Sequence, residues 1–158
     1  MSTSDVSGWA SAQIQVKQSS ASVPSPRWIE WLFDASADEH LVTAFIVPDN
    51  YFDTPVLEVY YKCTSAVANT FSMTCQVHAI SDGDAVDMDA DAYATANNAT
   101  QTVPGTAGHI NILSISLTND DSMVAGDFVT LMIFRDVSGD GVAGDIEFIG
   151  ARFLYNDS

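Results

Sequence analysis

The chain has 158 residues, enough for one domain with a single hydrophobic core. Its hydrophobic content of 47% excludes wholesale disorder. Its 5 Lys and Arg residues face 21 Asp and Glu residues, and the formal net charge of −16 disfavours nucleic-acid binding, because phosphate contacts need clustered basic side chains.

The N-terminal residues carry no recognisable targeting signal. Residues 1–18 lack the basic start and apolar core of a secretory signal. No apolar run approaches the roughly 18 residues that a membrane span needs. We therefore expect synthesis in a cytoplasm, a soluble product and no membrane partner.

Residues 1–26 are predicted to form an extended N-terminal arm. The segment is rich in Ser, Ala and Gln, and its apolar anchors are Trp9, Ile14 and Val16. The segment fits a flexible tail, a first edge strand, or an arm that orders against a neighbouring subunit, and residues 13–17 alternate as an added strand would. In the last case the three apolar side chains are the expected partner contacts.

The rest of the chain, residues 27–158, is predicted to form one all-β domain. Runs of β-type alternation are expected as strands at 27–33, 41–47, 56–63, 71–80, 110–117, 128–134 and 146–155. Residues 93–108 read as a low-complexity linker or an extended surface strand. No segment keeps an apolar period of 3.6 for three turns. The spacing predicts an antiparallel β-sandwich of the jelly-roll kind.

Two hairpins are expected within this sandwich. Strands 128–134 and 146–155 should form a central hairpin with a bend at Gly150, and strands 56–63 and 71–80 should form a meander hairpin. Cys63 and Cys75 lie in the second pair, where the expected register separates them by several residues. Two buried free thiols are therefore expected.

Segment 136–147 fits the twelve-residue calcium loop, with Gly141 at the sharp turn. The oxygen ligands would be Asp136, Ser138, Asp140, the Val142 carbonyl and Glu147. The segment is bounded by expected strands, whereas such loops are usually bounded by helices. A Gly/Asp-rich strand connection is the alternative, and calcium is the one cofactor that the sequence suggests.

The acidic run 81–92 allows a similar choice between a cation site and a solvated loop. Its carboxylates are Asp82, Asp84, Asp87, Asp89 and Asp91.

No enzyme signature is present, so we expect a non-catalytic protein. His40, His78 and His109 are far apart in sequence, no Ser lies in G-x-S-x-G, and there is no phosphate-binding loop. Most aromatic residues alternate as core residues do. Tyr60 and the pair at 51–52 are the ones that remain available for stacking against a sugar.

The chain resembles the small jelly-roll virion proteins of tailed bacteriophages over residues 27–155. The resemblance rests on the opening strand Trp28 to Phe33, the loop Pro48-x-x-Tyr51-x-x-x-Pro55, the pair Tyr60-Tyr61, and the closing segments Ala125-Gly126-Asp127-Phe128-Val129, Phe134-Arg135-Asp136 and Gly144-Asp145-Ile146. It implies a head decoration, cement or head-fibre protein. No functional residues transfer with the resemblance.

The leading prediction is therefore a structural virion protein on the outer surface of a bacteriophage head. Its expected partners are the major capsid protein and copies of itself in a homotrimer. The alternative is a carbohydrate- or receptor-binding module, calcium-assisted if the 136–147 loop binds the ion.

Overall fold

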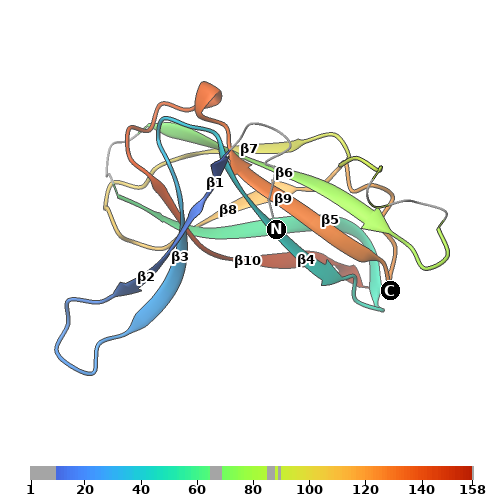
Figure 1. Cartoon of the computed structure of the whole chain (residues 1–158), viewed down its shortest axis with the longest axis horizontal. Helices are drawn as coiled ribbons and strands as arrows, with labels where there is room; N and C mark the ends of the chain where they lie inside the picture. Colours follow the sequence, from blue (N-terminus) through green and yellow to red (C-terminus); the bar gives the residue numbers. More distant parts are fainter. Residues whose placement is uncertain (1–9, 65–68, 85–87, 89, 158) are drawn as a thin grey trace.

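The computed structural model describes residues 10–64, 69–84, 88 and 90–157, and it confirms the all-β sandwich (Figure 1). The strands are β1 (Ala10–Ser11), β2 (Gln13–Gln18), β3 (Arg27–Phe33), β4 (Glu39–Ile46), β5 (Tyr51–Cys63), β6 (Thr70–Ile80), β7 (Asn97–Thr102), β8 (Asn111–Ser116), β9 (Phe128–Arg135) and β10 (Ile146–Asp157), with a short 3-10 helix at Val137–Gly139. Among the described residues, no helix has the length and apolarity of a membrane span.

Two five-stranded sheets face each other. One sheet has the order β1-β4-β9-β6-β7, and the other has the order β2-β3-β10-β5-β8. Within β3 to β10, this is the jelly-roll arrangement. The short β1–β4 pair is parallel, and the other strand pairs are antiparallel.

Both expected hairpins are wrong. Strands β9 and β10 lie in different sheets, as do β5 and β6, so each connection crosses from one sheet to the other. Alternation shows which side chains face the core, but it does not show which strand is the neighbour. Tyr61 of β5 and Phe71 of β6 meet across the sandwich instead, with ring centroids 4.8 Å apart.

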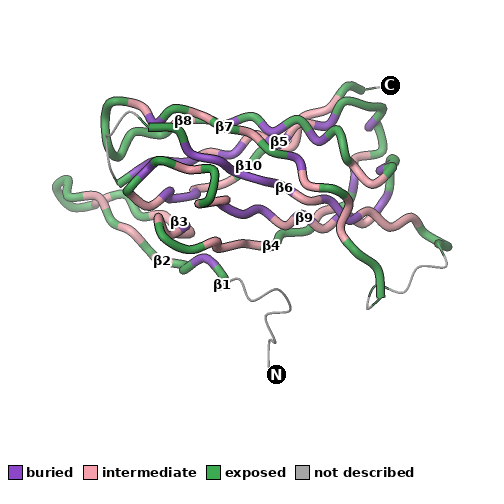
Figure 2. The backbone as a smooth tube through the Cα atoms, turned by 90° about the horizontal axis from the view of Figure 1, so that it is seen from above, coloured by how far each residue is buried: buried purple, intermediate pink, exposed green. Residues whose placement is uncertain are grey.

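The core lies between the sheets, where the buried residues of both inner faces meet (Figure 2). Its fully buried residues include Phe33, Val59, Phe71, Ile133 and Ile146. Both cysteines are buried and free, as predicted. Burial raises the pKa of Cys63 to about 11 and the pKa of Cys75 to about 12.

The described part of the expected arm belongs to this sandwich. Strand β2 pairs antiparallel with β3 as an edge strand, and residues 19–26 connect the two. The β2–β3 hairpin projects from one end of the body (Figure 1). Ile14 and Val16 are 66% and 70% exposed on it, and Trp9 lies outside the described residues.

Candidate functional site

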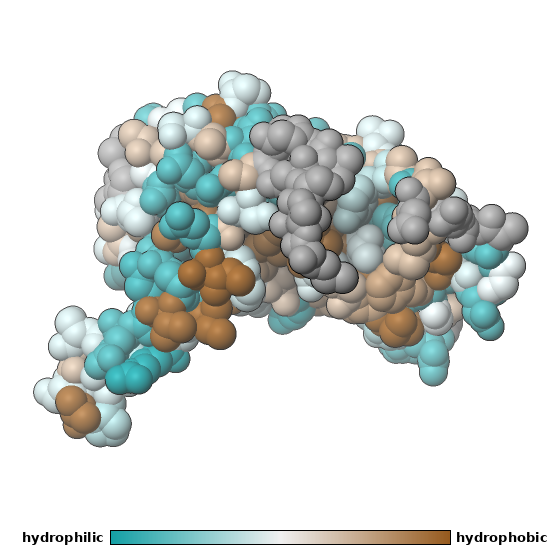
Figure 3. All heavy atoms as spheres, in the orientation of Figure 1, coloured by the Kyte–Doolittle hydropathy of each residue, from teal (hydrophilic) through white to brown (hydrophobic). Residues whose placement is uncertain are grey.

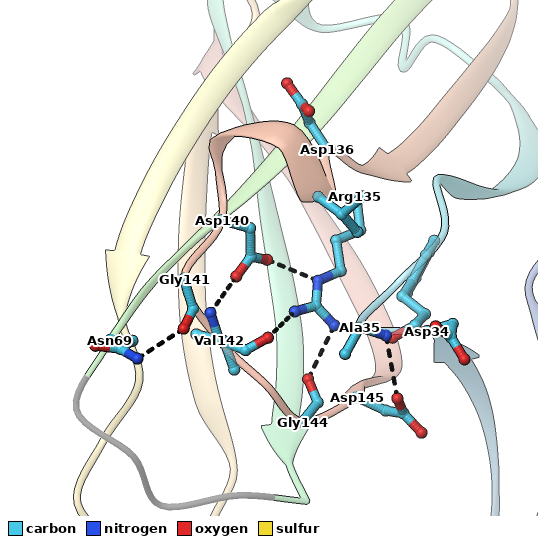
Figure 4. Close-up of polar contacts among 12 residues, drawn as sticks. Asp34, Ala35, Asn69, Arg135, Asp136, Asp140, Gly141, Val142, Gly144 and Asp145 are labelled. Carbon is cyan, nitrogen blue, oxygen red and sulfur yellow. Dashed lines mark hydrogen bonds and ion pairs between the residues drawn. The ribbon is translucent and has the colours of Figure 1, made fainter.

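The 136–147 loop is organised around the buried guanidinium of Arg135 (Figure 4). Its Nε donates to Oδ2 of Asp140 at 2.7 Å. Its terminal nitrogens donate to the carbonyls of Val142 at 2.8 Å, Gly144 at 2.9 Å and Phe33 at 3.2 Å. The Arg135 guanidinium therefore binds two of the oxygens that the calcium template assigns to a metal, those of the Asp140 carboxylate and the Val142 carbonyl.

The remaining template residues are directed elsewhere. Asp136 caps the 3-10 helix and accepts from the N–H of Ser138 at 3.0 Å and from its hydroxyl at 2.6 Å. Glu147 is buried beside Lys62 on the outer face of the β2-β3-β10-β5-β8 sheet. The structure thus does not bring Asp136, Asp140 and Glu147 together. Within the described residues, no group of three or more His, Cys, Asp and Glu side chains has the geometry of a metal site.

The acidic run does not gather its carboxylates either. Asp84 accepts from the N–H of Ser81 at 3.0 Å, and Asp91 lies 3.0 Å from Nε2 of His78. Asp87 and Asp89 lie outside the described residues. The other ring nitrogen of His78 is 3.5 Å from the Thr130 hydroxyl. Asp82 has no role that the structure explains.

A buried ionic cluster crosses four strands on the outer face of the β2-β3-β10-β5-β8 sheet. Lys62 of β5 lies 2.8 Å from Glu30 of β3 and 2.5 Å from Glu147 of β10. Lys17 of β2 lies 3.5 Å and 3.7 Å from the same two carboxylates. Trp28 donates its indole N–H to Glu30 at 2.7 Å. With two carboxylates and two ammonium groups, the cluster is charge-balanced.

Hydrogen bonding outweighs desolvation in this cluster. Burial opposes ionisation of Glu30, but hydrogen bonds from Lys62 and Trp28 hold its pKa below the ordinary value. Burial likewise opposes the charged form of Lys62, but its hydrogen bonds to Glu147 and Glu30 raise its pKa. The cluster fastens the β2–β3 hairpin to the body, and its charged groups are paired with one another.

A concave feature lies elsewhere among the described residues, a groove of about 420 Å³ along one side of the sandwich. It opens between β4 of one sheet and β10 of the other, with β3 at one end. Its aromatic lining residues are Trp31, Phe45, Phe148 and Phe153. We call this feature the lateral groove.

The lateral groove exists because β3 leaves β10 early. Strand β3 pairs with β10 only over Ile146–Phe148, whereas β5 pairs with β10 as far as Asp157. The register shifts between Phe148 and Gly150, where the predicted bend is found. Beyond this shift, no described strand pairs with the outer edge of β10. The two sheets are consequently open to solvent along this side.

Aromatic rings continue along the groove wall. Trp31 and Phe148 meet edge to face with centroids 5.6 Å apart, and Phe45 and Phe153 lie 4.8 Å apart. Phe153 continues the series to Tyr155, at 5.5 Å. Trp31, Phe45 and Phe153 are each partly exposed, so their rings are available to a ligand.

Sequence reasoning missed this site. It assigned the alternating aromatic residues to the core and left Tyr60 and residues 51–52 for a ligand. In the structure Tyr51 is buried, whereas the neighbouring Phe52 is exposed outside the groove. The alternation in β3, β4 and β10 predicted strands there but assigned no site to their inner face. It carried no signal that part of this face lacks a covering strand.

Comparisons with known proteins give the fold. No family model and no curated protein matches the chain. A solved structure of TmCBM61 in complex with β-1,4-galactotriose matches with a TM-score of 0.43 and 14% identity, over 95% of this chain and 90% of that chain. A carbohydrate-binding module specific for non-crystalline cellulose, CBM28, matches with a TM-score of 0.51 and 14% identity, over 94% of this chain and 89% of that chain. The second likeness shows a shared β-sandwich.

Proposed function

We propose that this chain is a non-catalytic carbohydrate-binding module that holds its ligand in the lateral groove. The observation that carries the proposal is the row of partly exposed aromatic rings, Trp31, Phe45 and Phe153, along an open groove of about 420 Å³. Ligand sites commonly have volumes of about 300 to 1,000 Å³ and a mostly apolar lining with few polar groups.

A sugar chain matches both components of this groove. The C–H faces of a pyranose ring are apolar and stack on aromatic rings, while its hydroxyl groups need hydrogen-bond partners. The outer edge of β10, which no described strand pairs beyond Phe148, supplies backbone N–H and C=O groups beside the rings. An elongated glycan lying along the groove would satisfy both requirements.

The shared sandwich supports the same proposal. CBM28, described as specific for non-crystalline cellulose, uses this architecture for a glycan. We therefore take soluble fragments of a β-1,4-glucan as the first probe.

A glycan array with and without a calcium chelator tests the proposal. We expect saturable binding that persists with the chelator, because the loop carboxylates already have protein partners. Trp31→Ala should abolish binding, whereas Phe52→Ala, an exposed aromatic outside the groove, should leave it unchanged. Absence of binding to every glycan would overturn the proposal.

A bacteriophage head protein is the second candidate, and the projecting hairpin favours it. Ile14, Val16 and Ile29 are exposed on one face of this hairpin, next to the body (Figure 3). Exposed apolar groups that gather on one face mark an interaction surface. In this case the partner is the major capsid protein and the location is the virion.

Sedimentation with undecorated shells tests this second candidate. The wild-type chain should co-sediment with the shells, and the double variant Ile14→Lys/Val16→Lys should remain in the supernatant. A wild-type chain that stays in solution would exclude it.

A further inference from the structure

We propose that β4 is a self-pairing edge, through which two copies of this chain join antiparallel about a two-fold axis. The two β4-containing sheets would become one continuous sheet. This inference does not depend on which ligand occupies the lateral groove.

The outer edge of β4 is uncovered over most of its length. Strand β1 pairs with β4 only at Glu39 and His40, while β9 pairs with the other edge of β4 from Glu39 to Ile46. No described strand covers the outer edge from Leu41 onward. Figure 2 shows β4 at the rim of the molecule.

The hydrogen-bonding groups on this edge can be assigned. Ala12 donates its N–H to the carbonyl of His40 at 2.8 Å, so the backbone N–H and C=O groups of His40 point to the outer edge. Successive residues of a strand alternate between edges. The N–H and C=O groups of Val42, Ala44 and Ile46 therefore point outward as well, with no described strand to receive them.

Native sheets usually protect such an edge with Lys, Pro, a bulge or a covering segment. Residues 41–46 are Leu-Val-Thr-Ala-Phe-Ile, with no charge and no proline. Their register with β9 is continuous. The edge is consequently suited to pairing with another strand.

The side chains identify the second strand as another β4. With Ala44 opposite its own copy, Val42 lies opposite the partner's Ile46 on the outer face. Val42 and Ile46 are 55% and 60% exposed, so each would gain an apolar neighbour. Ala44 places only a methyl group at the axis, and Thr43 lies opposite the partner's Phe45 on the groove side.

Charge restricts where two identical copies can meet. The chain carries a net charge of −16, so two copies repel each other over most of their surfaces. The uncharged edge at 41–46 allows close approach. Such an isologous contact closes at two copies, so the homotrimer expected from the phage resemblance would need a different surface.

A charge-swap experiment at the two-fold axis tests the inference. Analytical ultracentrifugation of the wild-type chain should show a concentration-dependent dimer. Ala44→Glu and Ala44→Lys should each be monomeric, because each places like charges opposite one another. Mixing the two variants should restore a dimer, which only a contact that pairs residue 44 with itself explains. Circular dichroism should show that both variants are folded.

The matched control is Ile110→Lys, at an exposed apolar position beside β8, the far edge strand of the other sheet, which should dimerise like the wild type. Hydrogen exchange supplies an independent readout: the amides of Val42, Ala44 and Ile46 should gain protection as concentration rises. A monomer at all concentrations would overturn the proposal. So would protection independent of concentration, since it would indicate that the same chain covers the edge. A dimer that both single variants retain would place the contact elsewhere.

Discussion

The Nε atom of Arg135 lies 2.7 Å from Oδ2 of Asp140, and both side chains are almost completely buried. This ion pair fastens the loop after β9 to the strand that precedes it. Three carbonyls accept from three of the four remaining N–H groups of the same guanidinium. The loop is thus organised by a cation that the chain itself provides.

Asp140→Asn should lower the free energy of unfolding by about 3 kcal/mol, because the substitution leaves the buried guanidinium without a counter-charge. Urea unfolding monitored by circular dichroism measures the change. Asp49→Asn, at an exposed loop position, is the control and should change stability by less than about 0.5 kcal/mol. Equal stability of the Asp140 variant and the wild type would mean that the loop does not depend on this pair.

Glu30 should make the stability of the protein pH-dependent at acid pH. Its pKa is lowered below the ordinary 4.5, so the unfolded state binds more protons than the native state in this range. The stabilisation is therefore complete above the ordinary value and is lost as the pH falls through the lowered pKa.

Comparison of the wild type with Glu30→Gln isolates this effect. The variant should be less stable near neutral pH, since Lys62 loses a charged partner, and the difference should shrink as the pH falls below 4.5. Urea midpoints over this range measure it. A difference that stays constant with pH would rule out titration of Glu30 as the cause.

Cys63 and Cys75 should be inert to thiol reagents in the folded protein. Both are buried, and their raised pKa values of about 11 and about 12 keep them protonated at neutral pH. Ellman's reagent should therefore react only after denaturant is added. Rapid reaction of either thiol under native conditions would contradict its position in the core.

Deletion of residues 1–18 should destabilise the domain by about 2 kcal/mol, because the buried Glu30 loses a charged-group hydrogen bond. Gln15 donates to it at 2.6 Å, and Lys17 lies 3.5 Å away. Thermal unfolding measures the loss. Deletion of residues 1–9 alone is the control, and the difference between the two deletions is the contribution of β1 and β2. An unchanged melting temperature for the longer deletion would show that β2 is dispensable.

Much of the fold could be predicted because strand residues alternate between core and solvent. The predicted strand at residues 27–33 coincides with β3, and the strands at 71–80 and 128–134 differ from β6 and β9 by one residue. The free thiols and the bend at Gly150 were also predicted. These features depend on local sequence and on burial, which alternation reports directly.

Strand pairing and the candidate site could not be predicted in the same way. The apolar alternation of β9 shows which of its side chains face the core. The alternation is the same whether the next strand of the chain pairs with β9 or lies in the opposite sheet. The lateral groove depends on β3 leaving β10 after Phe148, a long-range event with no local signal. Similarly, the calcium template recognises spacing, but the buried position of Arg135 decides where the carboxylates point.

An NMR titration shows whether the lateral groove is the ligand-binding surface. Isotope-labelled protein would be titrated with soluble cello-oligosaccharides while backbone amide shifts are followed. We expect saturable shifts that concentrate at residues 41–45 and 149–153 and are lost in Trp31→Ala. Saturable shifts that map to another surface, or no shifts at all, would contradict it.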